Sequence, residues 1–133
     1  MITADLVEYL GGLDGVPSVY CEVLPETPDS VVGVYTRAGS PPNTAAGLER
    51  KAVQVLVRGT AQDGRASYTV AETIYNALHR LVPDAALVTG GEHVQQIMAN
   101  NSGPYHIGRD AKGRHEWSIN FTCWVWNPAR EIA

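Results

Sequence analysis

The clearest pattern of hydrophobic and polar positions lies near the C-terminal end of the chain. From His115 onward every second residue is bulky or apolar, namely Trp117, Ile119, Phe121, Cys123 and Val125. Side chains in a strand alternate between two faces, so this pattern predicts a long strand with one face in a core. The preceding run from Asp110 to Gly113 suits a type I turn closed by a left-handed glycine. Residues 105–109 are then expected to form the partner strand of a terminal hairpin.

The end of this strand departs from the alternation, because Trp124 and Trp126 flank Val125. One face of a sheet cannot bury three consecutive large residues, so something else must cover the two tryptophans. Two interpretations are open. Either they pack under the N-terminal helix of this chain, or they contact a neighbouring subunit.

Two segments have the spacing of amphipathic helices. Residues 4–10 predict a short helix with an apolar stripe, for which Thr3 is a candidate cap. The main helix is expected over about residues 66–82, where Ala66, Val70, Ile74, Leu78 and Leu81 recur at spacings of three and four. Ser67 is a candidate cap for this helix, and Pro83 is expected to end it.

The remaining periodic segments predict strands. Residues 18–24 and 30–37 are expected to pair as a hairpin, and residues 49–58 have the valine content of a central strand. Residues 94–99 predict another strand, with brief pairing over 86–90. The order indicates an α+β fold, a mostly antiparallel or mixed β-sheet with both helices packed on one face.

Residues 38–48 have turn chemistry and no hydrophobic period. They predict an eleven-residue loop, which is long for a compact domain, and loops of this kind are commonly functional or mobile. We expect this loop to be mobile in the isolated protein and to become ordered in an assembly.

Length and composition narrow the classes of protein to consider. The chain has 133 residues, which suits a single domain over 1–133 that needs no disulfide or metal to fold. A net charge of −4 argues mildly against nucleic acid as the main partner. Charged residues make up 18%, below the ~25% typical of soluble domains. Either partners cover part of the surface, or the chain is a small polar domain rich in Gly, Ser, Thr and Asn.

The two cysteines and the N-terminal segment indicate a cytoplasm-like compartment. Cys21 and Cys123 lie far apart in apolar runs, so we expect buried free thiols. The first ten residues lack the basic start and uninterrupted apolar run of a signal peptide. No segment approaches the ~20 apolar residues that a membrane helix requires.

The sequence contains no recognisable set of catalytic residues. Its histidines at 79, 93, 106 and 115 fall in different predicted elements, and only His106 and His115 are placed to face each other across the terminal hairpin. The glycines follow no phosphate-loop spacing, and Cys123 lies in the middle of a strand. We therefore expect a non-enzyme with no catalytic residues, no metal and no cofactor.

The order of elements over nearly the whole chain resembles the tail terminator, or minor capsid, proteins of long-tailed bacteriophages. The most specific part is residues 104–121, which contain the run Gly-Arg-Asp-Ala-Lys-Gly-Arg-His-Glu-Trp-Ser-Ile-Asn-Phe. The resemblance implies a virion structural protein that forms a ring, expected to be a hexamer, on the head-proximal end of the tail tube and provides the head-tail joining surface. Its implied location is the virion tail, with the host cytoplasm during assembly.

The resemblance also implies partners. These are further copies of the chain, the major tail tube protein, and a head connector or neck protein. It implies no membrane and no sequence-specific nucleic-acid binding, although DNA can pass through such a ring. It transfers no binding residue, so the candidates for the subunit or tube interface rest on their chemistry alone: Trp124, Trp126, Pro41, Pro42 and Asn43. The alternatives are another neck or tail-completion protein, or a small monomeric binding module.

Overall fold

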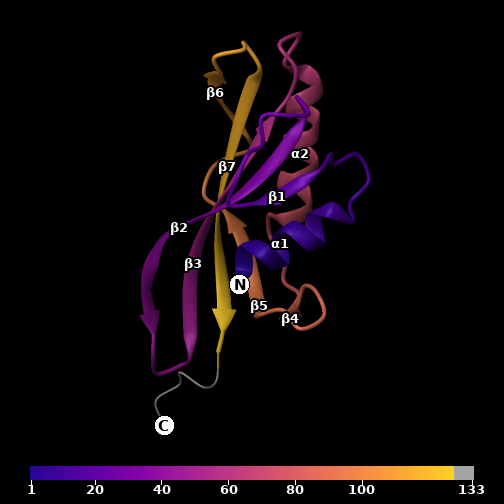
Figure 1. Cartoon of the computed structure of the whole chain (residues 1–133). Coiled ribbons are helices and arrows are strands. Elements are labelled where there is room, and N and C mark those ends of the chain that lie inside the picture. The colour runs from indigo at the N-terminus through magenta and orange to yellow at the C-terminus, as the bar shows by residue number, and fades with distance from the viewer. Residues whose placement is uncertain (128–133) are drawn as a thin grey trace.

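The structure is a computed structural model, and it describes residues 1–127. This part of the chain forms α1 (Ile2–Gly11), β1 (Val19–Cys21), β2 (Val31–Asn43), β3 (Leu48–Arg58), α2 (Arg65–Leu78), β4 (Ala85–Ala86), β5 (His93–Ala99), β6 (Tyr105–Arg109) and β7 (His115–Trp126). The strands form one mixed sheet in the order β1-β2-β3-β7-β5-β4, and β6 also pairs with β7. Both helices lie on the same side of the sheet (Figure 1). The predicted α+β class is therefore confirmed.

Strand β7 lies at the centre of the sheet and pairs on both of its edges. Along one edge, β3 runs antiparallel to β7 and pairs with it over the whole length of β3, from Leu48 opposite Trp126 to Arg58 opposite Glu116. The other edge is shared, because β6 pairs with the first part of β7 and β5 with the last part. The predicted terminal hairpin is confirmed, including a left-handed glycine at Gly113 with a φ of 76°.

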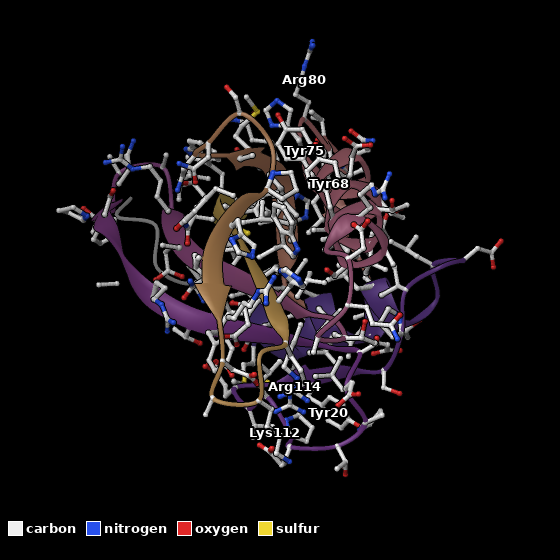
Figure 2. All side chains as sticks on the ribbon, turned by 90° about the horizontal axis from the view of Figure 1, so that it is seen from above. Tyr20, Tyr68, Tyr75, Arg80, Lys112 and Arg114 are labelled. Carbon is white, nitrogen blue, oxygen red and sulfur yellow. The ribbon has the colours of Figure 1, made fainter. Side chains whose placement is uncertain are left out.

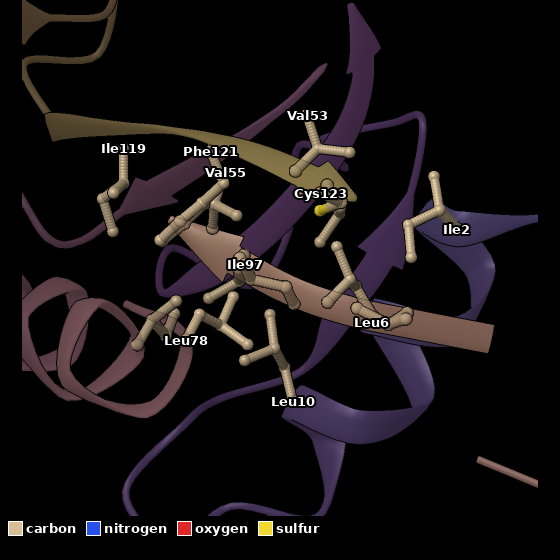
Figure 3. Packing of buried hydrophobic residues seen from close by; sticks show 14 of the residues in the cluster. Ile2, Leu6, Leu10, Val53, Val55, Leu78, Ile97, Ile119, Phe121 and Cys123 are labelled. Atoms are coloured by element: carbon tan, nitrogen blue, oxygen red, sulfur yellow. The ribbon is translucent and has the colours of Figure 1, made fainter. Parts of the chain in front are cut away.

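The core lies between the sheet and the two helices. Strand β7 contributes Ile119, Phe121, Cys123 and Val125, α1 contributes Leu6 and Leu10, and α2 contributes Ile74 and Leu78, all of them buried (Figure 3). The predicted register of β7 is confirmed, since its odd-numbered residues face the helices. Burial raises the pKa of the Cys123 thiol to about 12. Cys21 is only half-buried, so the expectation of two buried thiols holds for Cys123 alone.

Both helices differ from the predicted boundaries. The main helix ends at Leu78, four residues before the predicted end, because Leu81 leaves the helix and forms a β-bridge with Ile97. Leu81 thus packs against the core without being helical, which explains why its spacing was misleading. Thr3 and Ser67 are not caps, since Met1 and Gly64 occupy the N-cap positions.

The N-terminal strands also differ from the prediction. Strand β1 covers only Val19–Cys21 and runs parallel to β2, so these two strands do not form a hairpin. The predicted loop over 38–48 is mostly strand, because β2 continues to Asn43 and β3 begins at Leu48. Register shifts near Ser40 accommodate the irregular sequence there. Pro41 and Pro42 are tolerated because this part of β2 pairs only with β3, so no second strand needs their missing N–H groups.

We predict that Phe121→Ala lowers the free energy of unfolding by about 3–5 kcal/mol, because the ring is fully buried in the centre of the core. Chemical denaturation followed by circular dichroism measures this change. Ile107→Ala, at an exposed position on β6, is the control and should cost far less. A loss below about 1 kcal/mol for Phe121→Ala would contradict the assigned packing.

Candidate assembly interface

The end of the β2–β3 hairpin projects beyond the helices (Figure 1). We call residues 36–50 the arm. Residues 36–46 are exposed throughout, and they include the predicted interface residues Pro41, Pro42 and Asn43. The arm also has two arginines. Arg37 stacks over the Tyr35 ring at 5.2 Å and hydrogen-bonds to Gln54, whereas Arg50 is exposed on the opposite strand.

The two predicted interface tryptophans lie at the same end of the sheet as the arm. Asn43 pairs with Leu48, and Leu48 in turn pairs with Trp126 on β7. Arg50 pairs with Trp124 in the same way. The structure therefore gathers all five sequence candidates at one end of the molecule.

Both tryptophans are half-buried and do not belong to the core cluster. Trp126 contacts the His93 ring edge-on at a centroid distance of 5.2 Å. Trp124 lines a shallow depression together with Leu48, Val82 and Gln96. They point away from the face that contains Phe121, Cys123 and Val125, so the interpretation that they pack under the N-terminal helix is wrong.

A second feature lies at the opposite end of the sheet, where His106 and His115 face each other across the hairpin as predicted. Nε2 of His106 is 3.1 Å from Nδ1 of His115. Nε2 of His115 lies 2.6 Å from the carbonyl oxygen of Gln62. A carbonyl oxygen can only accept a hydrogen bond, so Nε2 of His115 must carry the hydrogen. With neutral rings, Nδ1 of His115 is therefore the acceptor and His106 the donor.

These histidines form one wall of an open pocket. We call it the aromatic pocket; its lining residues are Asp63, Gly64, Arg65, Tyr68, His106, His115 and Trp117, and its volume is about 360 Å³. Tyr68 of α2 lies edge-on to Trp117 of β7 at 5.1 Å, on the side of α2 that faces the hairpin (Figure 2). Trp117 is held by a 3.0 Å hydrogen bond from Nε1 to Ser67 Oγ. Sequence reasoning found the histidine pair but missed Tyr68, because nothing in the sequence places α2 beside the hairpin.

The pocket rim carries an ion pair between Asp63 and Arg65. Hydrogen bonds from the Arg65 side chain and main chain lower the pKa of Asp63 to about 2. Asp63 therefore stays ionised at neutral pH, and the two charges largely cancel at the rim.

Two buried arginines hold the loop over residues 25–29 at this end. Arg58 donates to the carbonyl oxygens of Pro25, Glu26, Pro28 and Asp29 at 2.5–3.3 Å. Arg114 binds Asp110 at 2.8 Å and the Glu26 carboxylate at 3.0 Å (Figure 2). No sequence pattern indicates this arrangement, because an arginine at the end of a strand is normally expected to be exposed.

The described residues offer no evident chemistry of another kind. Residues 1–127 contain no group of three or more His, Cys, Asp or Glu that could hold a metal ion. None of the helices in this range is both long enough and apolar enough to span a membrane. What the structure presents is a curled sheet with an exposed arm at one end and an aromatic pocket at the other.

These features describe a small α+β protein with an exposed arm and an aromatic pocket, and comparison with known proteins gives its family. The family of bacteriophage tail terminator proteins matches residues 6–125, so the chain belongs to that family. It is thus a structural protein of the virion tail. A solved structure shares the fold with a TM-score of 0.56 at 18% identity, over 95% of this chain and 91% of the other. No curated protein is significantly similar in sequence.

We predict that Arg58→Met destabilises the protein by about 1–3 kcal/mol, since it removes the buried guanidinium that donates to several carbonyl groups of the 25–29 loop. Thermal and urea unfolding provide the measurement. Arg109→Met, at an exposed position on β6, is the matched control and should have little effect. Equal effects of the two substitutions would contradict the role of Arg58.

Acid should weaken the hairpin turn through Asp110. Burial raises the pKa of this carboxyl, but the main-chain and side-chain hydrogen bonds from Arg114 outweigh it and leave the pKa below its usual value. Because the folded-state pKa is lowered, the ionised Asp110 carboxylate stabilises the folded protein at pH values above the unfolded-state pKa of ~3.9. This stabilisation is lost as the pH falls through the folded-state pKa of Asp110.

The measurement is the melting temperature of wild type and Asp110→Asn at neutral pH and at about pH 3. Wild type should lose more stability on acidification than the variant. A parallel decrease in both proteins would rule out this contribution from Asp110.

Proposed function

We propose that this tail terminator closes into a ring, a hexamer by family resemblance, on the head-proximal end of the tail tube. There it stops the addition of tube subunits and presents a surface to the head connector. The observation that carries the proposal is the family match over residues 6–125. Such a role requires extensive contacts and no reaction, which agrees with the surfaces described above.

The shape of the subunit supports ring formation. A closed ring of identical subunits needs a heterologous interface, in which two different patches of each subunit meet. The arm at one end and the aromatic pocket at the other are two different patches on the same sheet. The charged fraction of 18% is also suited to a surface that partners cover.

We assign the tube contact to Trp124 and Trp126. Tryptophan is among the residues that most often dominate binding energy at interfaces. Both lie outside the core, so replacing them removes contact area without opening a cavity around Phe121. Neighbouring Leu48 and exposed Val82 extend the apolar area around Trp124.

The test is a phage that lacks this protein and is supplied with variants. Trp124→Ser combined with Trp126→Ser should leave the circular dichroism spectrum unchanged and give overlong tails, or tails that fail to join heads. Val23→Ser, at an exposed apolar position just after β1, at the edge of the sheet and two strands removed from β7, is the control and should give normal particles. Normal, joined tails in particles without the protein would overturn the proposed function.

The oligomeric state of the protein distinguishes this function from that of a small binding module. A terminator has a route to a ring, whether in solution or on the tube, whereas a small binding module stays monomeric in both settings. Electron microscopy of tail ends distinguishes a terminator from another neck or tail-completion protein, since only the terminator sets tail length.

A further inference from the structure

The aromatic pocket is an apolar site that the fold leaves open. Trp117 and Tyr68 both line it, and Tyr68 is 36% exposed although its ring is large. With a volume of about 360 Å³, the pocket is within the size range of small binding sites and can take one or two side chains. Its walls come from α2, the 59–64 connection and the β6–β7 hairpin, all of which are fixed by the core.

The arm supplies a chemically matching segment. Pro41 and Pro42 are exposed in an extended strand, and proline pairs in extended conformation dock into grooves lined by aromatic rings. Since φ of proline is already fixed, little conformational entropy is lost when such a segment binds.

The arm cannot reach the aromatic pocket of its own chain. Arm residue Leu48 and Arg58 mark the two ends of β3, opposite Trp126 and Glu116 of β7. Ten residue steps along a strand span roughly 33 Å. The arm and the pocket therefore lie at opposite ends of the sheet (Figure 1), so a proline pair in the pocket must come from another copy.

Charges beside the two surfaces are complementary. Glu72 of α2 is exposed one helical turn beyond Tyr68, and it accepts a 2.9 Å hydrogen bond from the Tyr68 hydroxyl. Arg50 is exposed on the arm opposite Ser40, next to the prolines. Neither side chain forms an ion pair within residues 1–127, whereas Asp63 and Arg65 at the rim already pair with each other.

We propose that the arm of one copy docks into the aromatic pocket of the next copy, with Pro41 and Pro42 against Tyr68 and Trp117 and Arg50 beside Glu72. This head-to-tail contact rests on the proposed ring and names the two surfaces that join its subunits. The contact is heterologous, so it can repeat around a ring until the last arm fills the first pocket.

Cross-linking in assembled tails tests this contact directly. The protein carries Cys21→Ser, while Cys123 stays because it is buried and its raised pKa keeps the thiol protonated. Asn43→Cys on the arm is combined with Arg65→Cys at the pocket, and tails are treated with a short bismaleimide. A ladder of dimers, trimers and larger species is expected.

The matched control combines Asn43→Cys with Asn76→Cys. Asn76 is exposed on the same helix, eleven residues and about 16 Å along it from Arg65, so it should give at least tenfold less cross-linked product. Tails that contain the protein but give only monomers with the Arg65 pair would overturn the docking. So would equal ladders from both pairs.

A charge exchange provides a second test. Glu72→Arg and Arg50→Glu should each lower the amount of protein retained on tails by about tenfold, because each places like charges together in the contact. The combined variant should recover wild-type retention, and Glu8→Arg, the same change of charge at an exposed position on α1, should have no effect. Failure of both single variants to reduce retention would overturn the assigned pair. Tail length tests the proposed terminator function separately, so normal termination without cross-links would refute the docking alone.

Discussion

The structure depends on the pairing of β7 along both of its edges. Strand β3 follows one edge for its whole length, and β6 and β5 divide the other edge between them. A shift of one residue in this register would place Ser118, Asn120 and Thr122 in the core instead of Ile119, Phe121 and Cys123. The same register positions the contact surfaces, since Trp117 lies near the start of the strand and Trp124 and Trp126 near its end.

The two buried arginines, Arg58 and Arg114, hold the connection between β1 and β2 against one end of the sheet. Because β1 and β2 are parallel, the chain must turn back over residues 22–30 before β2 begins. A loop of this kind exposes many carbonyl groups, and Arg58 satisfies several of them with one side chain. Arg114 fixes the same loop to the β6–β7 turn through Glu26 and Asp110. The loop and the turn are thereby held as one unit next to the aromatic pocket.

An elongated sheet with unlike ends is well suited to a protein that assembles. The core lies under the helices and leaves both ends of the sheet free to contact other molecules. Exposed aromatic and proline side chains at these ends are available without loss of core packing, because Phe121 and its neighbours bury the apolar area that stabilises the monomer. The subunit can therefore be stably folded before the surfaces at the two ends of its sheet have bound any partner.

The sequence by itself determined the local elements with a strong period. The alternation from His115 to Val125 gave β7, its register and the facing histidines, since a two-residue period defines which side chains share a face. The apolar stripe of α2 was equally clear, and the family resemblance followed from the order of elements.

Only the tertiary structure decided features that depend on distant partners. The sequence of residues 38–48 reads as a loop, but pairing with β3 makes most of it strand. Leu81 continues the helical spacing, but its bridge to Ile97 places it outside α2. Arg58 is buried because a loop about thirty residues earlier surrounds it. Tyr68 and Trp117 are 49 residues apart and meet only when α2 packs on the sheet. Residue spacing along the chain predicts local geometry alone. Contacts between residues far apart in the sequence are therefore visible only in the tertiary structure.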